Sequence, residues 1–225
     1  MSRLRGPKSI KPDGPTAWAI LNERVFGDNQ VGGQHVLPKA DLLPLAWSDI
    51  FGRQAPMALE IGFNRGRFLR GLAEQYPDRN LVGIEIQRRF VWRLANQLGR
   101  DGGPRNIRVL WADAKAVSRS LFPEAIFSDV YITFPDPGWK RRHVKRRLVD
   151  TDFATELSRI LHPDGTIWIK SDVNAIAEEI AEALEAVPRL TARMPFEAGA
   201  LPLTHRESKC IAQGLPIYRY RFNGC

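Results

Sequence analysis

The sequence predicts an α/β fold with a doubly wound, mostly parallel β-sheet. Short apolar segments recur along the chain between residues 57 and 222. Between most of them lie longer segments whose apolar residues are spaced three and four apart, as on one face of a helix. Gly, Pro and Asp separate the two kinds of segment. Strands that alternate with helices of this length form a parallel sheet.

Each expected element follows from its own pattern. Apolar runs predict strands at 57–61, 81–86, 107–111, 130–134, 166–169 and 218–222. Helical spacing predicts a helix from 68 that ends before Pro77, and further helices at 90–98, 115–121, 153–161 and 176–187. The spacing around 42–50 permits one more short helix. Pro163-Asp164-Gly165 predicts a turn that leads into the strand at 166.

Length and charge set the domain organisation and the kind of partner. A chain of 225 residues forms one large domain, or a domain with an extension. We expect a basic, partly irregular N-terminal extension at 1–50 and the main domain at 51–225. The formal net charge of +8 favours a polyanionic partner such as nucleic acid or an anionic membrane surface. The first 15 residues are an expected basic arm, which either helps to hold nucleic acid or only solubilises the chain.

Other features point to a cytoplasmic protein without a metal. No apolar run approaches the ~18 residues of a membrane span, and the N-terminus lacks the apolar segment of a secretory signal. Cys210 and Cys225 have neither metal-ligand nor disulfide-framework spacing. The four histidines share no ligand spacing, so we expect no metal site. Monomer and homodimer both stay open.

A glycine turn follows the first regular strand. Gly62 and Gly66 lie between an expected strand and helix, where the backbone can approach a ligand closely. The dinucleotide pattern G-x-G-x-x-G would need glycine at Arg67. Glycines four apart, preceded by Glu60, instead fit the G-x-G-x-G loop of methyltransferases that use S-adenosylmethionine. The middle position is Asn64, one of the few non-glycine residues that readily adopt left-handed conformations.

Acids follow three further strands. Glu85 ends the second strand, where a carboxylate can accept from both hydroxyls of a ribose; the alternative is a surface carboxylate. Asp113 follows the third strand and either binds an adenine amino group or caps the next helix. Asp172 ends the fifth strand and is an N-cap or a site residue with about equal weight.

The segment after the fourth strand carries the most specific signal. Pro135 and Pro137 flank Asp136, and because proline donates no ladder hydrogen bond the strand must stop there. Ligands of open α/β sheets bind at the carboxyl ends of strands, so Asp136 is placed at a site. Residues 140–147 then hold six Lys or Arg and one His. A rigid carboxylate beside a cationic segment indicates a reaction on a polyanion; the alternative is a turn followed by a solvated charge run.

These residues together resemble the bacterial tRNA (guanine-N7-)-methyltransferase family, from about residue 57 to 222. Leu59-Glu60-Ile61-Gly62-Phe63 resembles the family's cofactor loop, and Gly83-Ile84-Glu85 its ribose-binding acid. Phe134 to Arg147 is similar to the signature F-P-D-P-W-x-K-x-R-H-x-K-R-R. Ser171-Asp172 matches a T-D pair, and Thr204-His205-Arg206-Glu207 a T-x-F-E element. The chain departs from the family at Asn64, at Gly138-Trp139, and at Arg206 in place of Phe.

The resemblance implies a Rossmann-like methyltransferase fold, S-adenosylmethionine as cofactor and tRNA as partner. It implies cofactor binding by Glu60, Gly62, Gly66, Glu85 and Asp113, and a catalytic role for Asp136. Substrate contacts fall on Lys140, His143, Arg146, Arg147, Asp172, Thr204 and Glu207. The expected reaction is methylation of a guanine in the variable loop of tRNA at N7. Two alternatives stay open: a methyltransferase that acts on another RNA base or on a protein, and a methyltransferase-like RNA-binding protein without activity.

Overall fold

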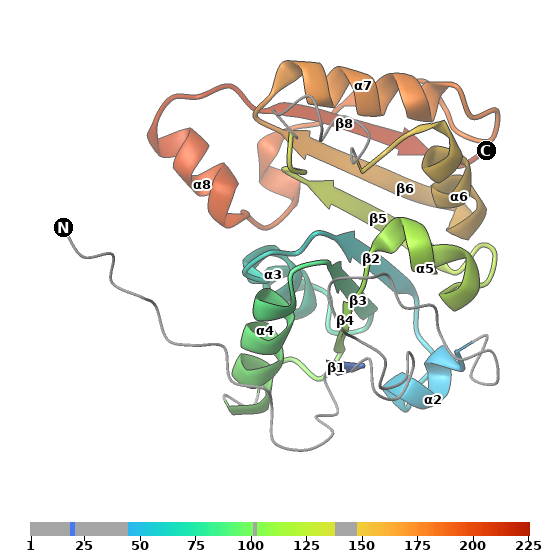
Figure 1. Cartoon of the computed structure of the whole chain (residues 1–225), viewed down its shortest axis with the longest axis vertical. Coiled ribbons are helices and arrows are strands. Elements are labelled where there is room, and N and C mark those ends of the chain that lie inside the picture. Colours follow the sequence, from blue (N-terminus) through green and yellow to red (C-terminus); the bar gives the residue numbers. More distant parts are fainter. Residues whose placement is uncertain (1–18, 21–44, 101–102, 138–147) are drawn as a thin grey trace.

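The computed structural model describes residues 19–20, 45–100, 103–137 and 148–225, which form one sheet with helices on both faces (Figure 1). The strands are β1 (Ala19–Ile20), β2 (Met57–Ile61), β3 (Asn80–Glu85), β4 (Ile107–Trp111), β5 (Phe127–Thr133), β6 (Leu161–Ser171), β7 (Met194–Pro195) and β8 (Tyr218–Asn223). The helices are α2 (Trp47–Phe51), α3 (Arg67–Gln75), α4 (Arg88–Arg100), α5 (Ala114–Leu121), α6 (Thr151–Ile160), α7 (Asn174–Glu185), the short 3₁₀ helix η3 (Ala198–Ala200) and α8 (His205–Ala212).

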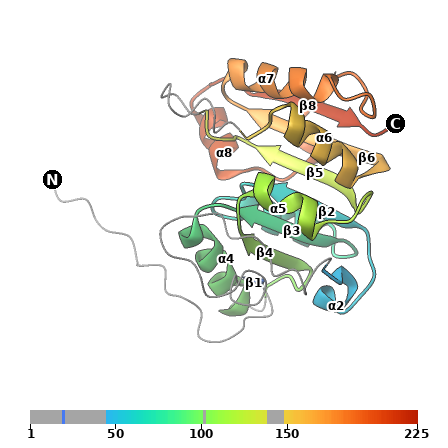
Figure 2. The ribbon, with the colours of Figure 1, turned by 45° about the vertical axis from the view of Figure 1, so that its right-hand side comes forward.

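The strand order places a ligand site at β2 and β5. The order is β1-β4-β3-β2-β5-β6-β8-β7, with β1 to β6 parallel, β8 antiparallel to β6, and β7 antiparallel to β8. The chain runs outward from β2 through β3 to β4, then returns to the other side of β2 as β5 (Figure 2). This reversal is the topological switch point, where open α/β sheets bind ligands beyond the carboxyl ends of the strands.

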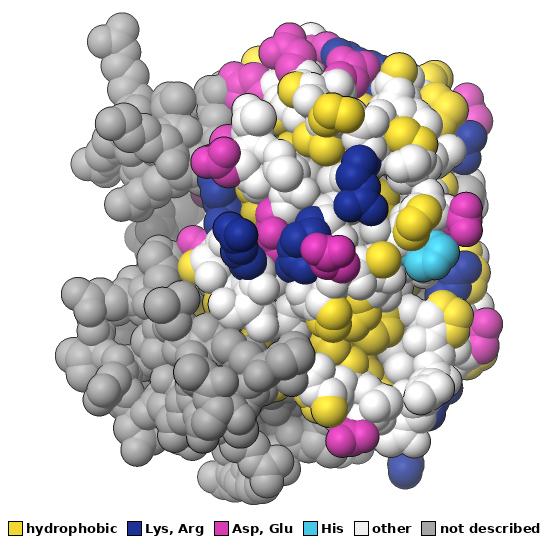
Figure 3. Space-filling view, turned by 90° about the vertical axis from the view of Figure 1, so that its right-hand side faces the viewer, with side chains coloured by type: hydrophobic (Ala, Val, Ile, Leu, Met, Phe, Trp, Pro, Cys, Tyr) yellow, Lys and Arg dark blue, Asp and Glu magenta, His cyan; other side chains and the backbone are white. Residues whose placement is uncertain are grey.

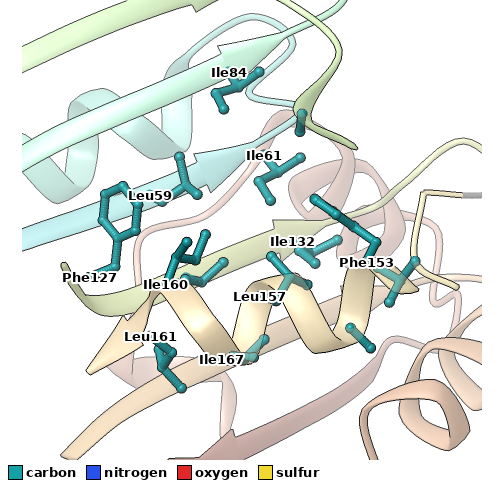
Figure 4. Packing of buried hydrophobic residues seen from close by; sticks show 14 of the residues in the cluster. Leu59, Ile61, Ile84, Phe127, Ile132, Phe153, Leu157, Ile160, Leu161 and Ile167 are labelled. Carbon is teal, nitrogen blue, oxygen red and sulfur yellow. The ribbon is translucent and has the colours of Figure 1, made fainter. Parts of the chain in front are cut away.

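Alternation along the strands divides the core between the two faces of the sheet. In β2, Leu59 and Ile61 belong to the cluster that packs under α5, α6 and α7, while Ala58 belongs to the cluster under α3 and α4. Successive side chains of a strand point to opposite faces, so a strand that is apolar at every position is buried on both. Figure 4 shows the first cluster, with Phe153 and Leu157 of α6 packed onto the strands.

The predicted fold class and the order of the predicted elements are confirmed, and the structure adds β1, β7, η3 and α8. β6 begins at Leu161 rather than after the expected turn, and its pairing with β5 jumps from Phe127↔Leu161 to Asp129↔Thr166. The residues between, 162–164, are exposed, so the predicted turn is a bulge inside a longer strand. Helix α8 was not expected, because its apolar positions are too few to show helical spacing.

Part of the expected N-terminal extension belongs to the folded body. β1 pairs with β4 through Ala19↔Val109 and Ile20↔Leu110. In α2, Trp47 is buried, stacks on Phe122 with ring centroids 5.4 Å apart, and donates from Nε1 to the carbonyl of Leu121 at 3.2 Å. Helix α2 includes residue 50, where the boundary between the extension and the main domain is expected. That boundary stays a prediction. Within the described ranges, no helix is both long and apolar enough to cross a membrane.

Close packing at Gly83 makes a testable prediction. A Cβ there would lie 2.6 Å from Leu69 Cδ2 and 2.7 Å from Phe63 Cδ1. Gly83→Ala should lower the free energy of unfolding by about 1–3 kcal/mol, because β3 and α3 cannot separate without disturbing the core. The exposed Gly199, where a Cβ has open space, is the control; Gly199→Ala should stay within about 0.5 kcal/mol. The free energy of unfolding of both variants is measured by urea denaturation, and equal values for the two would contradict the predicted clash.

Candidate active site

The loop between β2 and α3 is built from residues in left-handed conformations. The backbone φ angles are 79° at Gly62, 49° at Asn64 and 71° at Gly66. The middle position therefore keeps a glycine-like conformation although it holds asparagine, as expected. The N–H of Gly62 donates to the carbonyl of Ile84 at 2.7 Å, which ties the loop to the end of β3. A Cβ at Gly66 would lie 2.4 Å from Leu94 Cδ2, so glycine there lets α4 approach the loop.

Glu85 is anchored to this loop rather than exposed on the surface. Its side chain is 5% exposed, and Oε2 accepts from the backbone N–H of Asn64 at 2.9 Å. Oε1 accepts from the N–H of Gln87 at 2.8 Å. Burial raises the pKa of Glu85, and these hydrogen bonds oppose the shift. A carboxylate oxygen has two lone pairs, so each keeps room for a further donor such as a ribose hydroxyl.

Glu60, in β2, holds an unsatisfied buried oxygen. It is 1% exposed; Oε1 accepts from the Thr133 hydroxyl at 3.3 Å, while Oε2 has no partner among the described residues. Burial raises the pKa of Glu60 to about 8, against the lowering effect of the Thr133 hydrogen bond. Buried polar atoms in native proteins are nearly always paired, so this oxygen is an exception, and a cofactor-binding role for Glu60 stays a prediction.

Asp113 has the capping role that the sequence allowed. It is the N-cap of α5, and Oδ1 accepts from the N–H of Lys115 at 2.9 Å. The cap holds the carboxyl group at the end of β4, two strands from β2. A hydrogen bond to an adenine amino group stays a prediction, and the cap is compatible with it because a carboxylate accepts several donors.

Asp136 follows a strained turn at the end of β5. The strand stops at Thr133 as expected, and Phe134 has a φ of 51°. The N–H of Phe134 donates to the carbonyl of Lys170 at 2.7 Å, which fixes the turn to β6. A non-glycine residue in this region costs energy and persists where the surroundings hold it, often at functional sites. Asp136 is exposed and borders a small hollow beside Ile176 of α7.

The basic segment cannot be placed in this site. The predicted substrate contacts Lys140, His143, Arg146 and Arg147 lie in 138–147, outside the described residues. Their roles stay predictions from the sequence.

Asp172 forms an ion pair instead of an N-cap. The N-cap of α7 is Val173, without a side-chain cap, so the N-cap interpretation of Asp172 is wrong. Its Oδ2 accepts from Arg206 twice, from Nε at 2.9 Å and from Nη2. Arg206, which stands where the family has Phe, therefore connects α8 to the end of β6.

Thr204 and Glu207 begin helix α8 as a reciprocal capping box. The Thr204 hydroxyl accepts from the N–H of Glu207 at 2.9 Å, and Glu207 Oε2 accepts from the N–H of Thr204 at 3.4 Å. Glu207 has 0% exposure and also bonds Lys170 at 2.8 Å and Arg219 at 3.1 Å. The expected contact between Glu207 and tRNA is therefore not available in this structure, because no part of its side chain reaches the surface.

The sequence interpretation missed Lys170 and Arg219. Lys170, 1% exposed at the end of β6, has Nζ 5.3 Å from the centroid of the Phe68 ring. Desolvation lowers the pKa of Lys170, and the ion pair with Glu207 opposes this. Two signals were present: a lysine at the end of the apolar run Ile167-Trp168-Ile169, and the T-x-x-E spacing of a capping box.

The buried ion triad gives a stability prediction. Glu207→Gln should lower the free energy of unfolding by about 3–5 kcal/mol, because the buried Lys170 and the partly buried Arg219 lose the one acid that pairs with them among the described residues. The control is Glu178→Gln, which removes one of the two acids that pair with the partly exposed Arg193 and should cost much less. Urea denaturation of both variants is the measurement, and similar losses would contradict a special role for the buried triad.

The raised pKa of Glu60 gives a pH prediction. In the folded protein the carboxyl group keeps its proton up to about pH 8, whereas in the unfolded chain it loses it near 4.5. Between these values the folded state binds more protons, so Glu60 makes stability fall as pH rises. Glu60→Gln cannot ionise and should remove this contribution. The stability of the variant relative to wild type should rise between pH 5 and pH 9; a constant difference would contradict the shift. The exposed Glu74→Gln is the control.

Comparison with known proteins agrees with this geometry. The family model described as "Putative methyltransferase" matches residues 54–220. A tRNA (guanine-N(7)-)-methyltransferase of Synechococcus sp. (strain JA-2-3B'a(2-13)) is 36% identical over 224 residues, which cover 96% of this chain and 92% of that protein. The protein of the same name from Thermosynechococcus vestitus (strain NIES-2133 / IAM M-273 / BP-1) is 32% identical over 201 residues, 85% of this chain and 94% of that protein.

Solved structures with little sequence identity share the fold alone. The 16S rRNA methyltransferase KamB superposes with a TM-score of 0.58 at 14% identity and covers 86% of this chain and 97% of its own. The aminoglycoside resistance methyltransferase NpmB1 has a TM-score of 0.54 at 16% identity, with coverage of 80% and 92%. The sheet is thus that of Rossmann-like methyltransferases. On the sequence matches over nearly its whole length, the chain belongs to the tRNA (guanine-N(7)-)-methyltransferase family.

Proposed function

We propose that this chain transfers a methyl group from S-adenosylmethionine to N7 of a guanine in the variable loop of tRNA. The observation that carries the proposal is the placement of four acids. Glu60 lies on β2, Glu85 ends β3, Asp113 follows β4 and Asp136 follows β5, at one edge of the sheet and around its switch point. A module that only bound RNA would have no use for four acids in this arrangement, two of them buried.

The residues present fit the cofactor. S-adenosylmethionine is the methyl donor of this enzyme family, and its sulfonium supplies an electrophilic methyl group. The unpaired Oε2 of Glu60 offers a buried acceptor to a cationic or N–H group. The backbone around Gly62 and Gly66 allows close approach, Glu85 would accept from ribose hydroxyls, and Asp113 would accept from the adenine amino group.

Methylation at guanine N7 requires positioning and charge stabilisation rather than a strong base. Guanine N7 has a free lone pair, so it attacks the methyl group without first losing a proton. Positioning and electrostatic stabilisation then supply the rate. Methylation leaves the purine cationic, and the carboxylate of Asp136 would stabilise that charge as it develops. It would also be able to accept from the N1–H and the amino group of the guanine.

Asp172 would contact the substrate beside Asp136. The two acids leave neighbouring strands just after the paired residues Thr133 and Lys170. Arg206 binds only Oδ2 of Asp172, and Oδ1 accepts no hydrogen bond from the described residues, so Oδ1 is suited to a donor from a base. Residues 140–147 would bind phosphates, and tRNA as substrate would place the enzyme in the cytoplasm.

No observation favours an inactive RNA-binding protein or a different methyl acceptor. The substitution that most supported the inactive alternative, Asn64, keeps the left-handed loop conformation and binds Glu85 through its N–H.

The test is methyl transfer to unmodified tRNA transcripts, followed by nucleoside analysis. Wild type should form 7-methylguanosine, and Asp136→Asn should lower kcat by roughly 10²-fold, because a neutral side chain cannot stabilise the developing charge. The control is the exposed Asp78→Asn, which lies near the start of β3, away from the site. A different methylated base would refute the substrate assignment, and full turnover by Asp136→Asn would refute the role of that acid.

A further inference from the structure

Two stretches beside the active site, residues 62–73 and helix α8, expose no acidic side chain. The segment from the cofactor loop into α3 contains Arg65, Arg67 and Arg70, and it has no acid before Glu74. The exposed positions of α8 include His205, Arg206 and Lys209. The only acid of α8 is Glu207, which is fully buried and paired with two cations. It therefore cannot balance the exposed charges.

Direct contacts hold these two elements together. Arg65 Nη1 lies 3.4 Å from Nε2 of His205, and Arg67 Nη1 donates to the hydroxyl of Ser208 at 2.8 Å. The fold thus fixes Arg65 of the loop and Arg67 of α3 against the first turn of α8. The pKa of His205 is lowered, first by desolvation and then by the positive charges of Arg65, Lys209 and Arg67. This is expected in positively charged surroundings.

Some basic side chains elsewhere on the molecule have acidic partners. Arg193 bonds both Glu178 and Glu185, and Arg79 bonds Asp129. Figure 3 shows the side where the parallel strands begin, and its described side chains mix Lys and Arg with Asp and Glu. In the described part of the chain, Arg65 and Arg67 contact His205 and Ser208 instead of an acid, and Lys209 forms no ion pair. We call the surface formed by Arg65, Arg67 and Lys209 the rim. Like charges held together cost energy that a bound anion offsets.

The location of these basic side chains indicates what kind of anion they would bind. α8 carries Arg206, whose partner Asp172 faces the proposed base site, and Arg65 lies inside the cofactor loop. Several separate cations at the margin of a site suit a chain of phosphates better than one small anion. We propose that Arg65, Arg67 and Lys209 form a second phosphate-binding surface for the RNA substrate, apart from residues 140–147. This rests on the proposed function, since it takes tRNA as the partner.

The test compares two double variants with the same loss of charge. Arg67→Ala/Lys209→Ala removes two cations from the rim, and Arg119→Ala/Arg189→Ala removes two exposed cations outside it. The dissociation constant of a tRNA transcript is measured over a range of salt concentrations for wild type and both variants. The rim variant should bind roughly tenfold more weakly. Its slope of log affinity against log salt should be smaller by about 1–2, as for two lost phosphate contacts.

A second pair of variants separates charge from structure, because Arg67 also contacts Ser208. The side chain of Lys209 is exposed and forms no hydrogen bond with the residues that the structure describes. Lys209→Ala should therefore weaken tRNA binding and Lys209→Glu should weaken it further, with the urea midpoint and the affinity for S-adenosylmethionine unchanged. The proposed phosphate-binding surface would be refuted if the rim variant bound tRNA as tightly as wild type, or if the Arg119/Arg189 variant lost as much affinity as the rim variant. Neither result would affect the proposal of tRNA methylation. Failure of wild type to bind or methylate tRNA would instead overturn the proposed function, and this surface with it.

Discussion

The carboxylate of Glu207 is the interaction on which the arrangement of the C-terminal third depends. Lys170 and Arg219 are direct partners in the antiparallel pairing of β6 with β8. Like charges directly opposite on neighbouring strands destabilise a sheet, and here one of them is fully buried. Glu207 bonds both, and its capping box starts α8 at the same point. One acid thus joins a parallel strand, an antiparallel strand and a helix.

Helix α8 makes important contacts on both its buried side and its exposed side. Inward, Glu207 reaches the end of β6 next to Thr133, whose hydroxyl bonds Glu60. Outward, Arg206 holds Asp172, while His205 and Ser208 meet the arginines of the cofactor loop and α3. The same helix therefore borders both the proposed cofactor site and the proposed substrate site. Its buried charges are costly to desolvate, which fits a role in fixing geometry better than one in adding stability.

The sequence predicted the strands and the strand-end acids because both are local patterns. Five-residue apolar runs such as 57–61 need no distant information, and a proline pair stops β5 whatever surrounds it. The errors concern partners that are distant in sequence. Lys170 and Glu207 are 37 residues apart, and Asp172 and Arg206 are 34 apart. Thr204 to Glu207 matched both a substrate motif and a capping box, and only burial separates these roles.

Charge balance links the triad to Glu60. Lys170 belongs to the triad and lies near Glu60, where its positive charge lowers the pKa of Glu60 without overcoming desolvation. In the ligand-free protein Glu60 is therefore neutral near pH 7. A cation placed at Oε2 favours the ionised form and releases the proton. Burial keeps the carboxyl group neutral. The same burial strengthens the attraction between the ionised carboxylate and a cation, because few solvent dipoles screen the charge. Binding of a cationic ligand at this edge of the sheet is accordingly coupled to loss of the Glu60 proton.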